Sequence, residues 1–374
     1  MARRNSPWKL LFGISTRTSL ENRALASGVL PDRLLRRVIR SRVRGLVKGF
    51  DSRTEQEKAE RQAAVVAGFE SGPITVNADD ANRQHYELPP EFFEAALGPR
   101  LKYSCCYWPG GVTGLAQAEE AMLELTAKRA GLGDGQDILD LGCGWGSLAL
   151  WAAERYPRSR VVAMSNSNAQ RGFIENLRDQ RGLGNLDVVT AEVGSFEPRA
   201  HFDRVVSVEM FEHVRNHRVL LDRVAGWLKP EGRLFVHVFC HRRHVYAFDP
   251  AGAGGWMARH FFSGGVMPSW DYLAGYQDSL ALVDRWEIDG CHYSSTLRAW
   301  LDNLDRGRGR VMPLLEATYG HERATLWFAR WRVFFMTCEE TFALDSGRAY
   351  FVGHYLFSKT TRQCDGGSSL KKTK

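Results

Sequence analysis

Two patterns of apolar residues alternate along the middle of the chain. Short apolar runs typical of buried strands alternate with stretches whose apolar residues recur every three or four positions, as on one face of a helix. Strands that alternate with helices predict an α/β fold with a parallel sheet covered by helices on both faces. The expected strands lie at 138–141, 159–164, 186–191, 203–208 and 232–240, and helices are expected directly after the first strand, at 167–181 and at 215–228.

The ends of these strands are the places to look for a ligand. In open parallel sheets, ligands lie beyond the carboxyl ends of the strands. The residues at those ends are Asp140, Ser165, Glu192, Glu209 and His237.

Further elements flank this core on both sides. An insertion rich in glycine and aromatic residues, 248–268, interrupts the alternation before a helix and a strand near 283–291. Upstream, helices are expected at 32–48, 55–68 and 115–130, with a shorter one starting at Pro89 and Pro90. Downstream, two aromatic-rich helices are expected at 296–319 and 322–342, followed by a last strand at 349–359.

Composition indicates a globular protein. The 374 residues are 44% hydrophobic, which suffices for a full α/β core. No apolar run reaches the length of about 18 residues that a membrane span needs, and the start lacks the apolar core of a signal peptide. The seven cysteines form no Cys-x-x-Cys pair, so reduced thiols are expected and no metal site is predicted. A cytoplasmic location follows, with an organelle transit peptide as the alternative.

The positive charge is concentrated at the N-terminus. Residues 1–61 hold fifteen Lys and Arg against six Asp and Glu, whereas the rest of the chain holds 35 against 37. Within 31–50, Leu35, Ile39, Val43 and Leu46 fall on one helical face. This amphipathic helix predicts either peripheral contact with an anionic membrane or, as the favoured interpretation, packing on its own protein. The sequence leaves open whether the protein forms a homodimer.

The most informative stretch is QDILDLGCGWG, residues 136–146. A strand here passes through glycines into a helix, so a ligand can approach the backbone. A dinucleotide site would carry an acidic residue about 20 positions further on, but the next strand end, VVAMSN, has none, which disfavours NAD. The pattern Asp-x-Gly-x-Gly-x-Gly resembles motif I of the class I S-adenosylmethionine-dependent methyltransferases.

Several separate blocks, in order along residues 21–359, resemble the cyclopropane-fatty-acyl-phospholipid synthase superfamily of methyltransferases. Two further blocks, MARHFFSGGVMPS and WRVFFMTCEETF, look like its branch of plant coclaurine and pavine N-methyltransferases. The resemblance implies a class I methyltransferase fold: a Rossmann-like seven-stranded sheet with a reversed last hairpin, an N-terminal helical arm and a helical lid. The superfamily blocks are YSCCYW, DLGCGWGSLALWAAERYP, VEMFEHVRN, LFVHVFCH and HYSSTLRAWLDN.

On this basis the chain divides into five parts. Residues 1–20 and 360–374 are expected to be disordered ends. Residues 21–130 would form the arm and lid, residues 131–245 the Rossmann-like cofactor-binding core, and residues 246–359 a helical insertion with the last strands of the sheet.

The resemblance also implies S-adenosylmethionine as the cofactor and assigns residues to it. For Ser165 and Gln170, helix capping and surface polarity are the alternative interpretation. The implied cofactor residues are Tyr103, Ser104, Asp140, Gly142, Gly144, Ser165, Gln170, Glu192 and Val193.

The acceptor side would centre on VEMFEHV, residues 208–214. Family members that methylate amines use the positions of Glu209, Glu212 and His213 to hold and deprotonate the nitrogen, and Tyr86 and Glu87 would line the same pocket. An alkylammonium has no lone pair, so it must lose a proton before it can accept a methyl group. The alternative interpretation of the two glutamates is an exposed helix face.

Lipid-modifying members instead bind bicarbonate with a Cys, a Glu, a His and a Tyr. This chain has Cys105, Glu212 and His237 at the first three positions, but Phe334 replaces the Tyr. A phenyl ring cannot donate the hydrogen bond of a phenol, which puts bicarbonate use in doubt. With Trp331 and Phe335, Phe334 would form an aromatic wall suited to a flat ring or a cation, unless these rings belong to the core.

These observations predict an S-adenosylmethionine-dependent N-methyltransferase of small aromatic or alkaloid-like amines. The alternative is methylation or cyclopropanation of unsaturated lipid acyl chains. A binding protein without activity is disfavoured because no expected site position is degraded. Nucleic acid is not an expected partner, since no Asp/Asn-Pro-Pro-aromatic tetrad follows the fourth strand.

Overall fold

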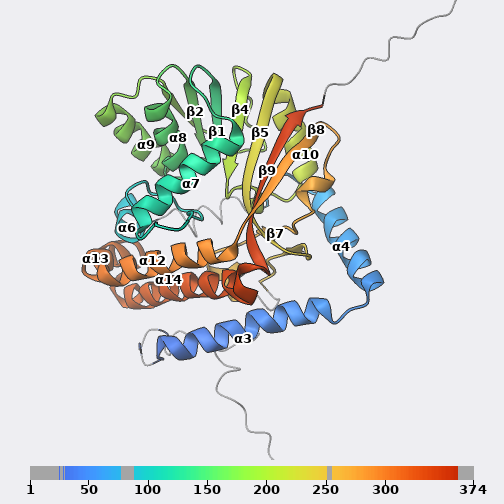
Figure 1. The fold of residues 1–374 in the computed structure, drawn as a ribbon. Helices are drawn as coiled ribbons and strands as arrows, with labels where there is room; N and C mark the ends of the chain where they lie inside the picture. The colour runs from blue at the N-terminus through green and yellow to red at the C-terminus, as the bar shows by residue number, and fades with distance from the viewer. Residues whose placement is uncertain (1–24, 26–27, 29, 77–87, 251–254, 361–374) are drawn as a thin grey trace, which may run out of the picture.

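The computed structural model describes residues 25, 28, 30–76, 88–250 and 255–360. A seven-stranded sheet with the order β3-β2-β1-β4-β5-β9-β8 forms its upper half in Figure 1. The first five strands run parallel, and β9 pairs antiparallel with both β5 and β8. This is the expected class I sheet with its reversed last hairpin. The strands are β1 Asp137–Leu141, β2 Arg160–Ser165, β3 Leu186–Thr190, β4 Phe202–Val208, β5 Leu228–His241, β8 Leu280–Ile288 and β9 Tyr350–Lys359.

Helices cover both faces of the sheet because its buried strands point alternate side chains in opposite directions. Val205 joins the core beneath α10, His217–Trp227, whereas its neighbour Val206 joins the core formed with three other helices. Those three are α7 Leu115–Ala130, α8 Ser147–Arg155 and α9 Asn168–Arg181.

A third core lies in a separate helical layer below the sheet in Figure 1. It reaches the glycine turn, because Trp145 packs its ring 4.9 Å from that of Phe93. The helical layer therefore closes over the carboxyl ends of the strands as a lid. Its helices are α6 Pro90–Ala96, α12 Gly290–Arg306, α13 Arg308–Tyr319 and α14 His321–Phe342.

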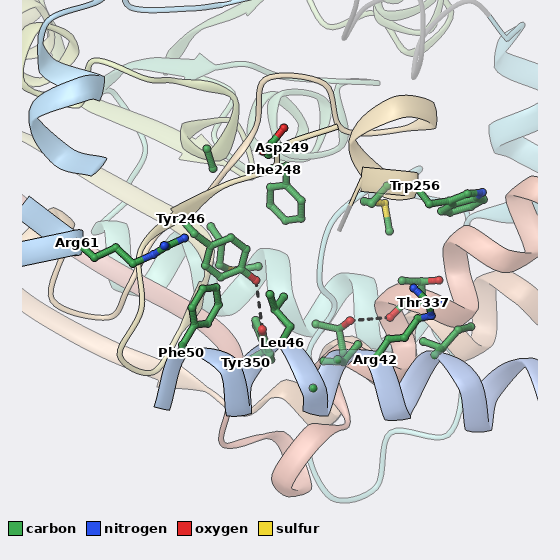
Figure 2. Close-up of a pocket in the computed structure, with 18 of the residues that line it drawn as sticks. Arg42, Leu46, Phe50, Arg61, Tyr246, Phe248, Asp249, Trp256, Thr337 and Tyr350 are labelled. Carbon is green, nitrogen blue, oxygen red and sulfur yellow. Dashed lines mark hydrogen bonds between the residues drawn. The ribbon is translucent and has the colours of Figure 1, made fainter. Parts of the chain in front are cut away.

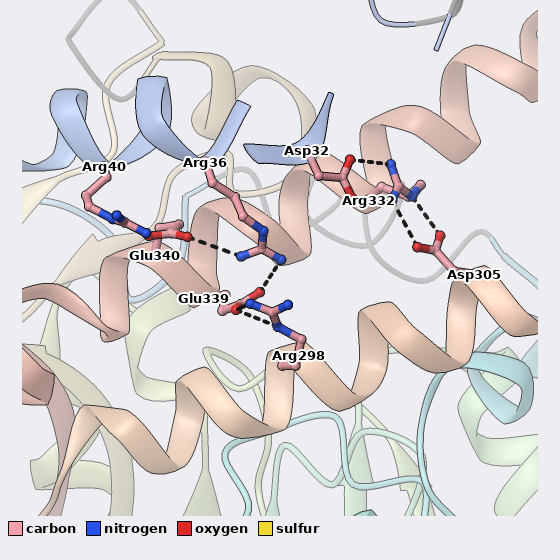
Figure 3. A network of polar contacts seen from close by, with 8 residues as sticks. All are labelled: Asp32, Arg36, Arg40, Arg298, Asp305, Arg332, Glu339 and Glu340. Atoms are coloured by element: carbon pink, nitrogen blue, oxygen red, sulfur yellow. Dashed lines mark hydrogen bonds and ion pairs between the residues drawn. The ribbon is translucent and has the colours of Figure 1, made fainter. Parts of the chain in front are cut away.

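The N-terminal arm consists of α3, Asp32–Asp51, and α4, Glu55–Glu70. The C-terminal half of α3 borders a cavity (Figure 2), and its N-terminal half is bound to the lid through ion pairs (Figure 3). Leu35 and Ile39 are buried, so the interpretation that the apolar stripe packs on its own protein holds for these two. The ion pairs are Arg36–Glu339 at 2.7 Å, Arg36–Glu340 at 3.2 Å, Arg40–Glu340 at 2.7 Å and Asp32–Arg332 at 2.8 Å.

Three predicted elements differ in the structure. The helix expected at 296–319 is divided at Gly307 into α12 and α13. The strand expected near 283–291 ends at Ile288, because the Asp289 side chain accepts from the Cys291 amide and caps α12. The helix expected before that strand is only the single 3₁₀ turn η2, Leu273–Gly275, held by short-range bonds.

The insertion between β5 and β8 carries a small sheet of its own. Strands β6, Tyr246–Ala247, and β7, Val266–Met267, pair antiparallel and enclose α11, Gly255–His260. The predicted disordered ends, 1–20 and 360–374, lie outside the described residues except for Thr360. Among the helices that the structure describes, none combines the length and the apolar character that a bilayer span requires.

Candidate active site

The glycine turn after β1 leaves space for a ligand. Gly144 has φ +54°, and no described atom lies within 4 Å of the position that a Cβ would take there. The amides of Gly142 and Cys143 both donate to the carbonyl of Met164, at 3.0 and 2.9 Å, which holds the turn against the end of β2. Gly142 and Gly144 line two adjoining cavities.

The first cavity, of about 100 Å³, lies at the ends of β2 and β3 and brings together Ser165, Gln170, Glu192 and Val193 as expected. The Ser165 hydroxyl donates to Gln170 Oε1 at 2.6 Å. Gln170 Nε2 is buried and has no hydrogen-bond partner among the described residues. The helix cap is Ser167, which accepts from the Gln170 amide, so capping does not explain Ser165. The amide donor of Gln170 fits a ribose hydroxyl.

The second cavity, of about 70 Å³, lies on the other side of the turn and is lined by Tyr103, Ser104 and Asp140. Asp140 is 2% exposed, and its Oδ2 has no partner within the described structure. Burial raises the pKa of Asp140 to about 7, so a ligand cation would stabilise its ionised form. Lys102, which the sequence did not single out, is buried and donates to the Cys105 carbonyl at 2.8 Å.

Glu209 lies where these two cavities meet a third one. Its side chain is only 8% exposed and accepts three hydrogen bonds, which excludes an exposed helix face. The donors are the Cys105 amide at 2.8 Å, His237 Nε2 at 3.1 Å and the Tyr293 hydroxyl. Burial raises the pKa of Glu209. The charge of Lys102 and the hydrogen bonds from the Cys105 amide and the Tyr293 hydroxyl lower it.

Behind Glu209, a line of hydrogen bonds runs across the sheet. His237 Nδ1 lies 2.9 Å from His354 Nε2, and His354 Nδ1 lies 2.8 Å from Arg129 Nη1. A guanidinium can only donate, so His354 Nδ1 accepts and His354 Nε2–H donates to His237. His237 then carries its proton on Nε2 and donates it to Glu209. Burial lowers the pKa of both histidines well below the usual value, which agrees with neutral rings carrying one proton each.

The third cavity, of about 130 Å³, is lined by Glu209, Glu212, His213 and Phe334. The Glu212 side chain is buried, and neither carboxyl oxygen has a partner in the described part of the chain. Burial, with Glu209 nearby, raises the pKa of Glu212 well above its usual range. Burial lowers the pKa of His213 to about 4, so its ring is neutral at pH 7. The positive charge of an ammonium ion would complement the carboxyl group of Glu212, which has no partner among the described residues.

Three of the other residues predicted for the acceptor pocket, Trp331, Phe335 and His237, do not line it. Trp331 and Phe335 line none of the five cavities described for the resolved part of the chain. They are almost fully buried in the lid, with Trp331 against Phe92, because the inner face of α14 forms the lid core. Only Phe334 thus remains of the aromatic wall. His237 supports Glu209 from behind, and Tyr86 and Glu87 lie outside the described residues.

The sequence did not point to Lys102, Arg129, Tyr293 or His354. A histidine in each of two apolar strands was the only available signal, at 237 and 354. The antiparallel register of β5 and β9 places these two directly opposite each other. Within the ranges that the structure describes, no group of three or more His, Cys, Asp or Glu side chains could hold a metal ion.

Comparisons with known proteins agree with this geometry. A family model described as "Mycolic acid cyclopropane synthetase" matches residues 75–350. The (S)-coclaurine N-methyltransferase of Thalictrum flavum subsp. glaucum is 32% identical over 339 residues, covering 90% of this chain and 94% of the relative. The pavine N-methyltransferase of the same plant is 29% identical and covers 89% of this chain and 94% of the relative.

A crystal structure of coclaurine N-methyltransferase bound to N-methylheliamine and SAH superposes with a TM-score of 0.86 at 32% identity. It covers 90% of this chain and 98% of that chain. The expected superfamily, its branch and the fold class are therefore confirmed.

Proposed function

The chain belongs to the mycolic acid cyclopropane synthetase family and is an S-adenosylmethionine-dependent methyltransferase, and we propose that its acceptor is the nitrogen of a small aromatic or alkaloid-like amine. One observation carries the proposal: the carboxyl group of Glu212 lines the third cavity and is buried without a hydrogen-bond partner among the described residues. An unpaired buried acid is costly to keep, and the charge of an entering ammonium would offset that cost.

The cofactor would be held across the glycine turn. When bound, S-adenosylmethionine supplies an electrophilic methyl group on a sulfonium. The open space at Gly144 and the unpaired polar atoms of Asp140 and Gln170 fit its methionine and ribose parts. The other residues predicted to bind the cofactor line the same two cavities: Tyr103, Ser104, Gly142, Ser165, Glu192 and Val193.

The two glutamates would have different roles. Glu209 already accepts three hydrogen bonds, so it supplies a fixed negative charge that attracts the cation. Glu212 has no such bonds within the described structure. Its raised pKa means that it must first release its own proton, which an entering cation favours. The ionised carboxylate can then take the proton of the ammonium, which leaves the nitrogen with the lone pair that attacks carbon. His213, with its pKa lowered to about 4, is the weaker base and would pass the proton on or orient the amine.

Positioning should contribute more than proton removal. A positioned base typically contributes about 10²–10⁴-fold to the rate, whereas alignment of the reacting atoms can supply roughly 7–11 kcal/mol. The bonds that fix Glu209 and the aromatic wall at Phe334 serve this alignment.

Lipid methylation is the second candidate, and the family description supports it. The residues that would bind bicarbonate have different neighbours here. The Cys105 amide and the His237 ring both donate to Glu209, whereas Glu212 lines a cavity that neither of them lines. Membrane contact through the basic arm, a homodimer and a cytoplasmic location stay predictions.

The purified chain, incubated with labelled S-adenosylmethionine and a panel of amines and unsaturated phospholipids, tests the assignment. We expect labelled N-methyl products, identified by mass, from alkylamines that carry an aromatic ring. Consumption of phospholipid without methyl transfer to any amine would overturn the proposal.

A further inference from the structure

The second cavity, beside the glycine turn, is lined by a buried cation. Lys102 is 3% exposed, and no other positively charged side chain of the described residues lines this cavity. Its ammonium group donates to the Ser104 hydroxyl and, at 2.8 Å, to the Cys105 carbonyl. An ammonium has three N–H donors, so these two bonds leave one donor for a further acceptor.

The charge of Lys102 is not neutralised by direct contact with an acid. Within the described ranges of the chain, its ammonium group forms only the two bonds to Ser104 and Cys105 and no ion pair. Burying a charge without a counter-ion is costly. The negative charge of an entering ligand would offset this cost.

An acid lines the same cavity. Asp140 is buried, and its Oδ2 has no partner in the described part of the chain. Asp140 and Lys102 are both described, and no ion pair joins them. A ligand that carries an anion and a cation close together can therefore pair with both side chains.

Two hydroxyl groups complete the lining. Thr126 Oγ1 on α7 and Ser147 Oγ at the start of α8 are buried, line the cavity and have no hydrogen-bond partner among the described residues. A hydroxyl can donate to a carboxylate or accept from an ammonium. Buried polar groups in native proteins nearly always have partners, so a cluster of such groups around one cavity of about 70 Å³ indicates a polar ligand.

We propose that the second cavity binds the amino-acid end of S-adenosylmethionine, with its carboxylate at Lys102 and its ammonium at Asp140. Lys102 then determines a selectivity of the enzyme for cofactors that carry the carboxylate over decarboxylated ones. The reverse orientation is disfavoured because it would bring like charges together at both side chains. This inference does not depend on the acceptor, but it rests on the proposed placement of the cofactor at the glycine turn.

Lys102 also supports the protein itself. The Cys105 residue whose carbonyl it holds donates its amide to Glu209. Loss of this support alone would weaken every ligand of the site to the same extent. Loss of a carboxylate partner weakens only the ligands that carry the carboxylate. The test therefore compares ligands as well as variants.

The test measures dissociation constants by calorimetry for three ligands. They are S-adenosylhomocysteine, its decarboxylated analogue and its deaminated analogue. Because a hydrogen bond to a charged group typically contributes about 10–100-fold, we expect Lys102→Met to weaken S-adenosylhomocysteine and the deaminated analogue by about that factor. The decarboxylated analogue should lose less than about threefold.

Asp140→Asn is the matched variant at the other end of the ligand. It keeps the shape of the side chain and should reverse the pattern, because the ammonium partner is then the group that is lost. S-adenosylhomocysteine and the decarboxylated analogue should bind more weakly, and the deaminated analogue should change less than about threefold. If Lys102→Met folds poorly, the unaltered protein still decides: it should bind S-adenosylhomocysteine at least about tenfold more tightly than the decarboxylated analogue.

Equal losses for all three ligands in Lys102→Met, or no loss for any of them, would overturn the assignment. Equal affinity of the unaltered protein for S-adenosylhomocysteine and its decarboxylated analogue would contradict it as well. Failure of the cofactor placement looks different, because Gly144→Val would then still bind S-adenosylhomocysteine. Failure of the proposed amine methylation would change none of these dissociation constants.

Discussion

The cofactor side and the acceptor side of the active site are built in different ways. Most of the residues expected to hold the cofactor lie at the ends of three neighbouring strands and in the turns that follow them, between Asp140 and Val193. The acceptor side combines residues as far apart in the sequence as Cys105 and His354. One side depends on local motifs, and the other on how distant elements pack.

The acids of the two sides differ from the acid that lies between them in how they are paired. Asp140 and Glu212 each retain carboxyl oxygens without partners in the described structure, whereas Glu209 between them accepts three hydrogen bonds. Unpaired buried acids are suited to interact with a ligand, and a fully bonded one is suited to hold its position. Variants that separate these roles test the comparison directly.

The largest effect is expected on the cofactor side. Gly144→Val should abolish cofactor binding, because the side chain would fill the open space at the turn. Gly182→Val is the matched control: Gly182 has a similar φ of +66° and an open Cβ position, but it ends α9 and lines none of the three active-site cavities. Calorimetry with S-adenosylhomocysteine measures both. Micromolar affinity retained by Gly144→Val would contradict the cofactor placement.

On the acceptor side, Glu212→Ala should lower kcat by about 10²–10⁴-fold, the usual contribution of a positioned base. Cofactor affinity should stay within about twofold, since Glu212 lines only the acceptor cavity. Steady-state kinetics and calorimetry on the same preparation separate the two quantities. Parallel losses in both would indicate a role in folding instead.

A smaller effect is expected where the acceptor side is supported from behind. His354→Phe removes the hydrogen bond that fixes the proton of His237 on Nε2, so His237 can no longer be relied on to donate to the Glu209 carboxylate. A hydrogen bond to a charged group contributes about 1.5–3 kcal/mol, and we expect kcat to fall roughly 10–100-fold. The His237 ring should show a changed tautomer by ¹⁵N NMR, and Arg129→Lys should keep most of the activity because it retains a donor. An unchanged tautomer together with lost activity would point to packing alone.

The last prediction concerns stability. Folding raises the pKa of Glu212. An unfolded Glu ionises at about pH 4.3. Between that pH and the raised pKa, the native state therefore binds one more proton than the unfolded state. Stability attributable to this group should then fall as pH rises, by at most about 1.4 kcal/mol per pH unit. Glu212→Gln should remove that slope and be more stable than the parent at pH 7 in urea titrations. An identical pH dependence in both proteins would show that Glu212 is not protonated in the free enzyme.

The sequence alone determined the sheet and the cofactor turn. Strand and helix periodicities and the spacing of the glycines are local properties, so β1 to β4 and the turn at Gly144 could be located without coordinates. Ser165 could be placed at a strand end in the same way, but its role and that of Gln170 came only from the family resemblance. The break between α12 and α13 at Gly307 and the end of β8 before Asp289 were missed. A single residue decides each of them, and one residue does not change the apolar pattern around it.

Only the tertiary structure decided the acceptor side. The register of β9 against β5 brings His354 to His237, and the packing of α14 sends Phe334 to the cavity but Trp331 to the core. The stripe on α3 was visible in the sequence, yet only its docking against α14 shows that Ile39, Val43 and Leu46 line the cavity of Figure 2 and that Leu35 does not. Contacts between distant segments depend on how whole elements pack, and no local pattern encodes that arrangement.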